Sequence, residues 1–297
     1  MYGGLPRKGR PSKSRMEDTT RNLSETGSLR AENLQDQPFV DIHCHCLAGA
    51  DDGPDTEAQS LALCQALAAD GISRVIATPH QLGRFSGCNE PAEIREAVSS
   101  LNQELRRHGI VLHVFVGGDV RVDERLCAML DTDCILTLAD GGRYLLLELP
   151  HEILIDIEPL LEELSCRGVE AILSHPERHL VLAKQPGIVL RWLEHSVHLQ
   201  VTAGSLLGEF GPVAEKAAWQ LLSHGWASLV ATDAHGLHRR RPCMRAAFER
   251  IRLRLGEQMA RLACVENPAR ILEGRPLESI ESPSAGKSGN ERVFSDL

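Results

Sequence analysis

The chain lacks any long hydrophobic run. No stretch of its 297 residues approaches the roughly 20 apolar residues that an α-helix needs to span a bilayer. The basic N-terminus is not followed by an apolar segment of the kind found in secretory signals. We therefore expect a protein that does not insert into membranes and that resides in the cytoplasm.

Positive charge, disulfide patterns and nucleotide-binding loops are also scarce or missing. The 32 Lys and Arg residues are outnumbered by 41 Asp and Glu residues, and the formal net charge of −9 argues against nucleic acid as a partner. The basic run His238–Arg241 is a local exception. The nine cysteines form no paired framework, so reduced thiols are expected. Neither G-x-G-x-x-G nor G-x-x-x-x-G-K-[ST] occurs, which excludes the common phosphate-binding loops.

Two polar terminal segments flank the region that can form a core. Residues 1–38 and 278–297 are polar or charged and lack apolar periodicity, so we predict a disordered N-terminal extension and a disordered C-terminal tail. Residues 39–277 have a length within the range of one α/β barrel. A single domain over 39–277 is therefore predicted.

Short apolar runs alternate with segments of helical periodicity along this domain. A helix is predicted over 56–70, for example, with Asp55 or Thr56 as its N-cap and Gly71 after its last residue. Seven strand–helix units favour a mainly parallel sheet that closes, or nearly closes, into a barrel, with an open doubly wound sheet as the alternative. The predicted strands cover residues 39–43, 74–77, 111–116, 144–148, 170–173, 198–202 and 229–231.

Histidines and carboxylates follow six of the seven predicted strands. Reactive groups of such a barrel lie at the C-terminal ends of the strands. His43 and His45 stand two apart on a strand, so both side chains point to the same face and can bind one ion. The whole set implies two or three ions, and imidazole combined with carboxylate suits Mn, Fe or Zn. The candidates are His43, His45, Asp51 or Asp52, His80, Asp119, Glu148, His175, Asp233 and His235.

Most of these residues also have an ordinary structural explanation. A lone H-x-H pair is often a hydrogen-bonded structural pair, and an Asp-Asp-Gly sequence fits a turn or a helix cap. Glu148 is harder to explain in this way, because a carboxylate after Tyr-Leu-Leu-Leu would be buried and would need a charged partner. The coincidence of the whole set at one end of a barrel favours a metal site. Cys44 and Cys46 alternate with the histidines and are predicted to pack on the opposite face.

The motifs also follow one another in a recognisable order. D-I-H-C-H at 41–45 is followed by D-D-G at 51–53, T-P-H at 78–80, H-P-E-R at 175–178 and D-A-H-G at 233–236. This order resembles the PHP (polymerase and histidinol phosphatase) superfamily. More narrowly, it is similar to the metal-dependent tyrosine-protein phosphatases of capsule and exopolysaccharide operons, the CpsB/CapC/YwqE group. The resemblance covers about residues 39–277.

The resemblance implies a fold, a metal site and two further residues. The implied fold is a distorted (β/α)7 TIM-like barrel, the PHP fold, and the implied site holds three ions, commonly assigned as Mn. Arg178 and Arg240 correspond to the family's phosphate-binding arginines, although Arg239 and Arg241 leave the second assignment open by one position. Asp119 stands where relatives usually carry Glu, so its reach is one methylene shorter. The implied ligands are His43, His45, Asp52, His80, Asp119, Glu148, His175, Asp233 and His235.

Phosphomonoester hydrolysis fits the charge of such a site. Three divalent ions against four carboxylates leave a charge of about +2, which matches the −1.5 to −2 of a phosphotyrosine. The resemblance adds the expected substrate, phosphotyrosine on the tail of a tyrosine kinase of exopolysaccharide or capsule biosynthesis. Two alternatives stay open: a small-molecule phosphoesterase such as histidinol phosphatase, and a non-catalytic regulator that binds phosphotyrosine.

Overall fold

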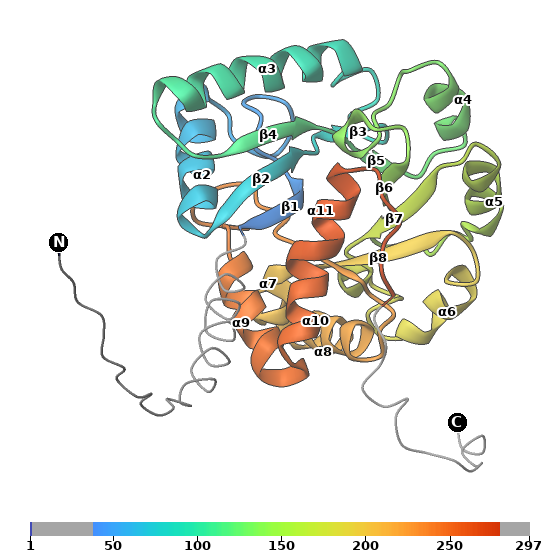
Figure 1. Ribbon diagram of the computed structural model, residues 1–297. Coiled ribbons are helices and arrows are strands. Elements are labelled where there is room, and N and C mark those ends of the chain that lie inside the picture. The colour runs from blue at the N-terminus through green and yellow to red at the C-terminus, as the bar shows by residue number, and fades with distance from the viewer. Residues whose placement is uncertain (2–37, 280–297) are drawn as a thin grey trace. The chain divides into compact units, whose positions relative to one another are not determined.

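The strands are all parallel and lie in the order expected of a barrel. The computed structural model describes Met1 and residues 38–279. Along the chain, strands alternate with helices that cover the outside of the sheet (Figure 1). The main strands are β1 (Phe39–Cys44), β2 (Ile72–Ala77), β4 (His113–Val116), β6 (Tyr144–Glu148), β7 (Glu170–Ser174), β8 (Val197–Thr202) and β9 (Leu229–Ala231).

Two strand positions are interrupted. After two residues β2 continues as β3 (His80–Gln81), and β4 continues in the same way as β5 (Asp119–Arg121). β2 pairs with β4, whereas β3 pairs with β5, which in turn joins β6. The nine strands of residues 38–279 therefore occupy seven positions, as the alternation of the sequence predicts. The short strands β3 and β5 are not predicted from the sequence.

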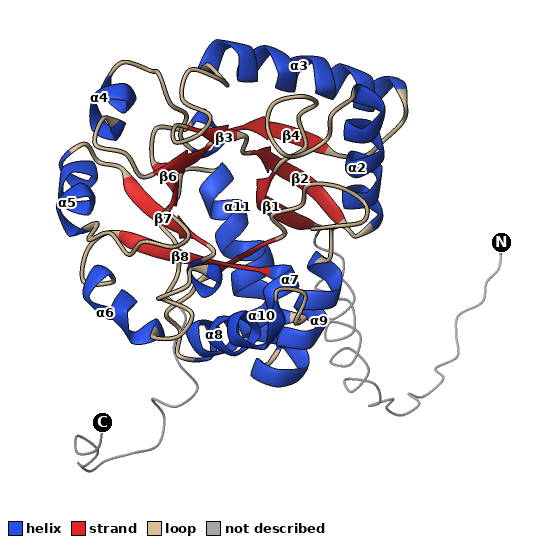
Figure 2. Cartoon of the chain, turned by 180° about the vertical axis from the view of Figure 1, so that it is seen from behind, coloured by secondary structure: helices blue, strands red, loops and turns tan. Residues whose placement is uncertain are grey.

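The first and last strands meet and close the ring. Cys44 forms a parallel bridge with Ala234, and the backbone N–H of Asp233 donates to the carbonyl oxygen of His43 over 2.8 Å. The N–H of His45 donates to the carbonyl oxygen of Ala234 over 2.9 Å. This closure, visible in Figure 2 as a ring of strands, rules out the open doubly wound alternative.

The helices largely follow the predicted periodicity. α2 begins after Thr56, whose hydroxyl accepts from the N–H of Gln59, while the side chain of Gln59 accepts from the N–H of Thr56. This capping box confirms Thr56 as the N-cap. α6 is short, because a 3-10 turn at Pro186–Ile188 precedes it. The helices are α2 (Glu57–Ala69), α3 (Pro91–Arg107), α4 (Leu126–Asp131), α5 (Glu158–Cys166), α6 (Val189–Trp192), α7 (Ala203–Leu206), α8 (Gly211–Ser223), α9 (Met244–Leu255), α10 (Glu257–Arg261) and α11 (Asn267–Leu272).

Two apolar cores lie on the two sides of the sheet. The larger one fills the space between the strands and the outer helices. The smaller one fills the barrel itself with residues such as Ile42, Leu146 and Ile172, and Ile271 of α11 packs into it. Figures 1 and 2 both show α11 crossing the ring of strands. One end of the barrel is thus sealed by apolar side chains.

A register shift in β1 turns the two histidines toward the other end of the barrel. Val40 and Ile42 point into the inner core, whereas Cys44 and Cys46 belong to the outer core. The shift lies between Asp41 and Cys44, relative to β2. His43 and His45, which alternate with the cysteines, are therefore directed into the barrel mouth, and both cysteines are fully buried packing residues, as predicted.

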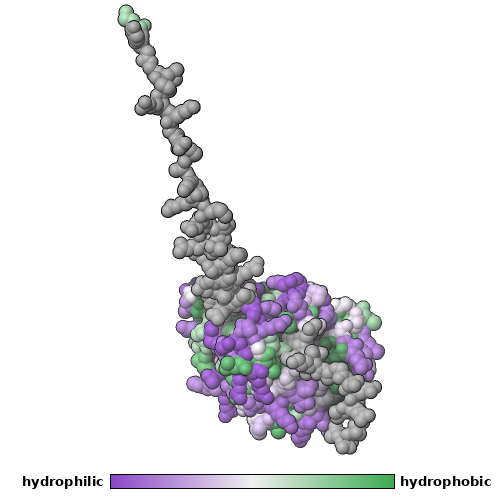
Figure 3. Space-filling model, turned by 60° about the horizontal axis from the view of Figure 1, so that its bottom comes forward, coloured by the Kyte–Doolittle hydropathy of each residue, from purple (hydrophilic) through white to green (hydrophobic). Residues whose placement is uncertain are grey.

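The face in Figure 3 is mainly hydrophilic, with smaller apolar areas between the polar residues. Within residues 38–279, no helix is long and apolar enough to cross a membrane. Segments 2–37 and 280–297 lie outside the described residues, so the predicted disorder of both ends stays a prediction.

Candidate metal centre

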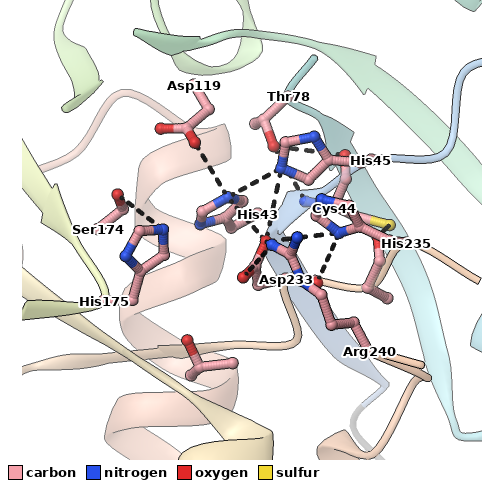
Figure 4. Close-up of polar contacts among 12 residues, drawn as sticks. His43, Cys44, His45, Thr78, Asp119, Ser174, His175, Asp233, His235 and Arg240 are labelled. Carbon is pink, nitrogen blue, oxygen red and sulfur yellow. Dashed lines mark hydrogen bonds and ion pairs between the residues drawn. The ribbon is translucent and has the colours of Figure 1, made fainter. Parts of the chain in front are cut away.

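All nine candidate ligands of the sequence lie together at the open end of the barrel. Their nitrogen and oxygen atoms form four overlapping groups, and within each group the atoms lie within 4.8 Å of one another. The sharing of His43, His45, His80 and Asp119 between groups places the groups side by side. Figure 4 shows the part of this cluster around His43, with His45, Asp119, His175, Asp233 and His235. The groups are His45, Asp52, His80 and His235; His43, His175 and Asp233; His43, His45 and Asp119; and His80, Asp119 and Glu148.

Asp119 shows that these residues fit metal ions. Its carboxylate is fully buried, yet neither oxygen makes a hydrogen bond within the described residues. The nearest nitrogens are His80 Nδ1 at 3.2 Å and His43 Nε2 at 3.5 Å. A buried carboxylate without donors is costly unless a cation neutralises it. The β3–β5 pairing places Asp119 directly beside His80, so the shorter side chain still lies inside the cluster.

Of the two adjacent aspartates, Asp52 faces the cluster and Asp51 supports it. Asp52 Oδ1 lies 3.4 Å from both His80 Nε2 and His235 Nε2. Asp51 instead accepts from His45 Nδ1 over 2.5 Å and from the backbone N–H of His80 over 3.0 Å. A hydrogen bond at Nδ1 fixes the ring and leaves Nε2 for a metal ion.

Two supporting residues are not evident from the sequence. Gln200 of β8 accepts from His43 Nδ1 over 3.0 Å, so His43 also directs its Nε2 into the cluster. The Nε2 atoms of His43 and His45 lie 3.2 Å apart. Asp41 is fully buried and accepts from both the hydroxyl and the backbone N–H of Thr232, which joins β1 to the segment after β9. Burial raises the pKa of Asp41 to about 6.

Arg178 and Arg240 both reach the central carboxylate. Each guanidinium forms an ion pair with Asp233, and Arg240 also lies 3.7 Å from Asp52. Arg178 is held over the ring of Phe210 at 4.4 Å. The neighbouring Arg241 lies 3.7 Å from Glu209 instead. Of the three consecutive arginines, the geometry therefore singles out Arg240 as the one that faces the cluster.

The backbone is strained where it presents these groups. His175, Asp233 and Arg240 have φ values of 33°, 52° and 52°, in the left-handed region that non-glycine residues rarely adopt. Such conformations persist only where surrounding contacts enforce them, and they concentrate at functional sites. Of the eight non-glycine residues with positive φ in the described part of the chain, three are candidate site residues: two candidate ligands and one candidate phosphate-binding residue.

Glu148 has the charged partner that its burial requires. Arg121 of β5 donates to it over 3.1 Å. Burial and the nearby Asp119 raise the pKa of Glu148, whereas His80 and Arg121 lower it. Arg121 was not singled out from the sequence, because nothing in its local pattern shows that it lies beside Glu148.

The surroundings raise the pKa values of some of these histidines and lower that of another. Burial lowers the pKa of His43, but Asp233 and Asp119 outweigh it and raise the pKa to about 9. Asp119 and Asp52 likewise raise the pKa of His80 to about 11 against the effect of burial. Burial and His235 lower the pKa of His45 to about 3. Ions that bind to His43 and His80 therefore displace protons.

A hollow of about 380 Å³ opens directly above the cluster. Four arginines line it together with Phe85, whose ring stacks on His80 with centroids 5.3 Å apart. Glu177 of the H-P-E-R motif does not face this hollow; it is buried and accepts from the N–H of Thr202 and the hydroxyl of Ser205, each over 2.8 Å. The arginines are Arg84, Arg121, Arg178 and Arg240.

One cysteine has a spacing that resembles a different phosphatase chemistry. Cys264 and Arg270 are separated by five residues, as in the C-x5-R loop of cysteine-dependent phosphatases. Cys264 is fully buried in a helical turn, and burial raises the pKa of its thiol. The thiol is therefore not available as a nucleophile.

The parallel barrel and the buried histidines and carboxylates at its mouth define a metal-dependent barrel enzyme. The family model of capsular polysaccharide synthesis, CpsB/CapC, matches residues 39–273, and the chain belongs to this family. It is 34% identical over 203 residues to the tyrosine-protein phosphatase YwqE of Bacillus subtilis, covering 68% of this chain and 79% of that protein. It is 25% identical over 241 residues to the tyrosine-protein phosphatase CpsB of Streptococcus pneumoniae, covering 79% of this chain and 98% of that protein.

Solved structures agree with the fold. A crystal structure from work on YwqE and CpsB, described as metal-dependent tyrosine phosphatases, matches with a TM-score of 0.77 and 30% identity over 81% of this chain and 97% of the other. A phosphotriesterase homology protein from Escherichia coli, crystallised with phosphate in its active site, matches with a TM-score of 0.51 at 12% identity, over 79% of this chain and 98% of that one. The second match speaks for the barrel fold alone. The family resemblance and the fold predicted from the sequence are thus confirmed.

Proposed function

We propose that this chain is a metal-dependent tyrosine-protein phosphatase of capsular polysaccharide synthesis. The observation that carries the proposal is the cluster of nine candidate ligands, all buried or partly buried except the exposed Asp52, directly beneath a hollow lined by arginines. Membership in the CpsB/CapC family and the similarity to YwqE support it.

We further propose that two or three divalent ions occupy the cluster, with Mn as the first candidate and Fe or Zn as alternatives. His43, His45 and Asp119 would hold one of them. Asp233 and His175 extend the cluster on one side, and Asp52, His80, His235 and Glu148 extend it on the other. Bound ions would neutralise the phosphoryl oxygens and activate water for attack on phosphorus.

The two arginines bind and orient the phosphoryl group. Arg178 and Arg240 approach from the wall of the hollow, and both carry planar guanidinium groups that match phosphate oxygens. Their present partner is Asp233, a candidate ligand, so ions would relieve them of that carboxylate. They would then stabilise the charge that develops on the equatorial oxygens. A tyrosyl group leaves with a pKa near about 10 and needs little help from a general acid.

The proposed substrate is phosphotyrosine on a protein, with the tail of a capsule or exopolysaccharide tyrosine kinase as the physiological candidate. This part rests on the family. The hollow above the cluster favours a dianionic group, because four arginines line it in a chain whose net charge is −9.

The test is phosphate release from a phosphotyrosine peptide by protein loaded with Mn²⁺, measured beside histidinol phosphate. We expect turnover of the peptide that EDTA abolishes, and a fall of about 10²–10³-fold in kcat/KM for Arg178→Gln. Preference for histidinol phosphate would replace the proposal with the small-molecule phosphoesterase. Fewer than two ions per chain, together with no turnover, would favour the non-catalytic regulator.

A further inference from the structure

The wall of the hollow above the metal centre contains one aromatic hydrocarbon ring. Within residues 38–279, Phe85 is the only Phe, Tyr or Trp side chain that lines this hollow. Leu82 also lines it but is only 3% exposed, whereas Phe85 is partly exposed. Most of the other lining residues are charged or polar. Phe85 therefore supplies the main apolar surface beside the proposed phosphate-binding arginines.

Two neighbours hold the ring of Phe85 in place. The ring stacks on that of His80, with an angle of 13° between the two planes. The guanidinium carbon of Arg84 lies 4.7 Å from the centroid of the same ring, and Arg84 itself lies 3.3 Å from Asp52. These contacts restrict the side chain of Phe85 before any ligand arrives, so a ligand that meets the ring loses little affinity to the ordering of Phe85.

The turn that carries Phe85 is fixed at both ends. Leu82 and Asn89 have φ values of 66° and 58°, in the left-handed region. The side-chain amide of Asn89 donates to the carbonyl oxygens of Ala50 over 3.0 Å and of His80 over 2.8 Å. The backbone N–H of Phe85 donates to the carbonyl oxygen of Leu82 over 3.0 Å. Strained backbone persists only where such contacts enforce it and concentrates at functional sites, so the turn forms a firm wall of the hollow.

We propose that Phe85 is a specificity-determining residue that receives the aromatic ring of a phosphate ester bound at the metal centre. In an aryl phosphate the ring is joined directly to the ester oxygen, so it must lie in the same hollow as the phosphoryl group. Aromatic rings attract one another in offset and edge-to-face arrangements with centroids about 4.5–7 Å apart. An alkyl phosphate makes no such contact. The inference rests on the proposed phosphatase function and assigns the selection of aryl over alkyl esters to one residue.

The test compares two phosphonates that the enzyme cannot hydrolyse. Phenylphosphonate and methylphosphonate carry the same phosphonate group and differ in the ring, and isothermal titration of the Mn²⁺-loaded protein measures the Kd of each. We expect Phe85→Leu to lower the ratio of the Kd for methylphosphonate to the Kd for phenylphosphonate by about 3- to 10-fold. Phe85→Tyr keeps an aromatic ring and should retain the native ratio.

Phe248→Leu is the matched control. Phe248 of α9 is also partly exposed, and its ring centroid lies 5.3 Å from that of Phe39, but it does not line the hollow. This variant should retain the native ratio. A native ratio in Phe85→Leu would overturn the role of Phe85. Equal weakening of both phosphonates in Phe85→Leu would overturn it as well, because Phe85 would then act only through His80 and the bound ions.

Turnover of p-nitrophenyl phosphate separates this inference from the proposed function. Turnover by the native protein, together with a lowered phosphonate ratio in Phe85→Leu, supports both proposals. Turnover with an unchanged ratio in Phe85→Leu overturns the role of Phe85 alone. A lowered ratio in Phe85→Leu without any turnover by the native protein overturns the phosphatase and leaves a site that binds aryl phosphonates.

Discussion

The two ends of the barrel differ in the side chains that form them: charged groups gather at the open end and apolar groups at the closed end. At the open end, buried charges, strained backbone and the Asp119 carboxylate, which makes no hydrogen bond within the described residues, face one another across the mouth. At the closed end, Ile271 packs into the inner core, and the hydroxyl of Tyr144 donates to the carbonyl oxygen of Arg275 over 2.7 Å. Asn267 also binds the backbone of Glu278 through both its amide and its carbonyl groups.

This difference between the two ends places the residues for function at the open end and the residues for stability at the closed end. The open end concentrates groups that are costly to bury without ligands, and the closed end supplies the packing that offsets this cost. Substitutions at the open end should therefore reduce catalysis more than folding, and substitutions at the closed end should do the reverse. Four substitutions test this division.

The largest effect is expected for Asp119→Asn. The amide keeps the shape of the side chain but removes the charge between His43 and His80, so we expect kcat with Mn²⁺ to fall by about 10³-fold, or about 4 kcal/mol of transition-state stabilisation. Steady-state kinetics measure this loss. Asp123→Asn, in the segment after β5, is the control and should retain activity. Full activity in Asp119→Asn would remove Asp119 from the ligand set.

At the closed end, Ile271→Ala should have the largest effect on folding. Removing a buried side chain from the inner core leaves a cavity, and we expect the free energy of unfolding to fall by about 2–4 kcal/mol in urea denaturation. At 25 °C kcat should change by less than about twofold. Leu253→Ala, at a position 78% exposed, should cost less than about 0.5 kcal/mol. A large loss of kcat in folded Ile271→Ala would contradict the division between the two ends.

An intermediate effect is expected for Arg121→Gln. The guanidinium orients Glu148 and balances its charge, and loss of such a supporting contact weakens metal affinity by about 10-fold. Isothermal titration with Mn²⁺ measures this affinity. Arg95→Gln provides the comparison, because Arg95 forms ion pairs with Asp133 and Asp140 away from the cluster. Equal Mn²⁺ affinities in the native protein, Arg121→Gln and Arg95→Gln would show that Arg121 does not act through Glu148.

The smallest effect belongs to Tyr144→Phe. This change removes one hydrogen bond to the backbone of Arg275 and keeps the ring in the inner core, so the free energy of unfolding should fall by about 1 kcal/mol. Urea denaturation measures the difference, and kcat serves as the internal control. A change in metal affinity would show that the two ends are coupled.

The sequence predicts the open end better than the closed end. The spacing of two residues between His43 and His45 can be read from the sequence, and on a strand it predicts that both side chains point to one face. Parallel strands also place their C-terminal ends at one edge of the sheet, whatever the details of packing. Gln200 and Arg121 carry no such signal, because their roles depend on which strand lies next to which. The packing of Ile271 into the inner core cannot be predicted for the same reason. The sequence of a short helix near the end of the chain does not indicate that the helix packs against the inside of a barrel.

The meeting of β1 with the segment after β9 has a consequence for how the protein is made. His43 and Asp233 are neighbours in space, but nearly the whole domain separates them along the chain. A growing polypeptide therefore lacks Asp233 and His235, two of the nine candidate ligands, until its last strand emerges and docks, and closing so long a loop is a late event in folding. Chains cut short before residue 235 would lack part of the candidate ligand set, so the proposed binding of ions would depend on the docking of this last strand.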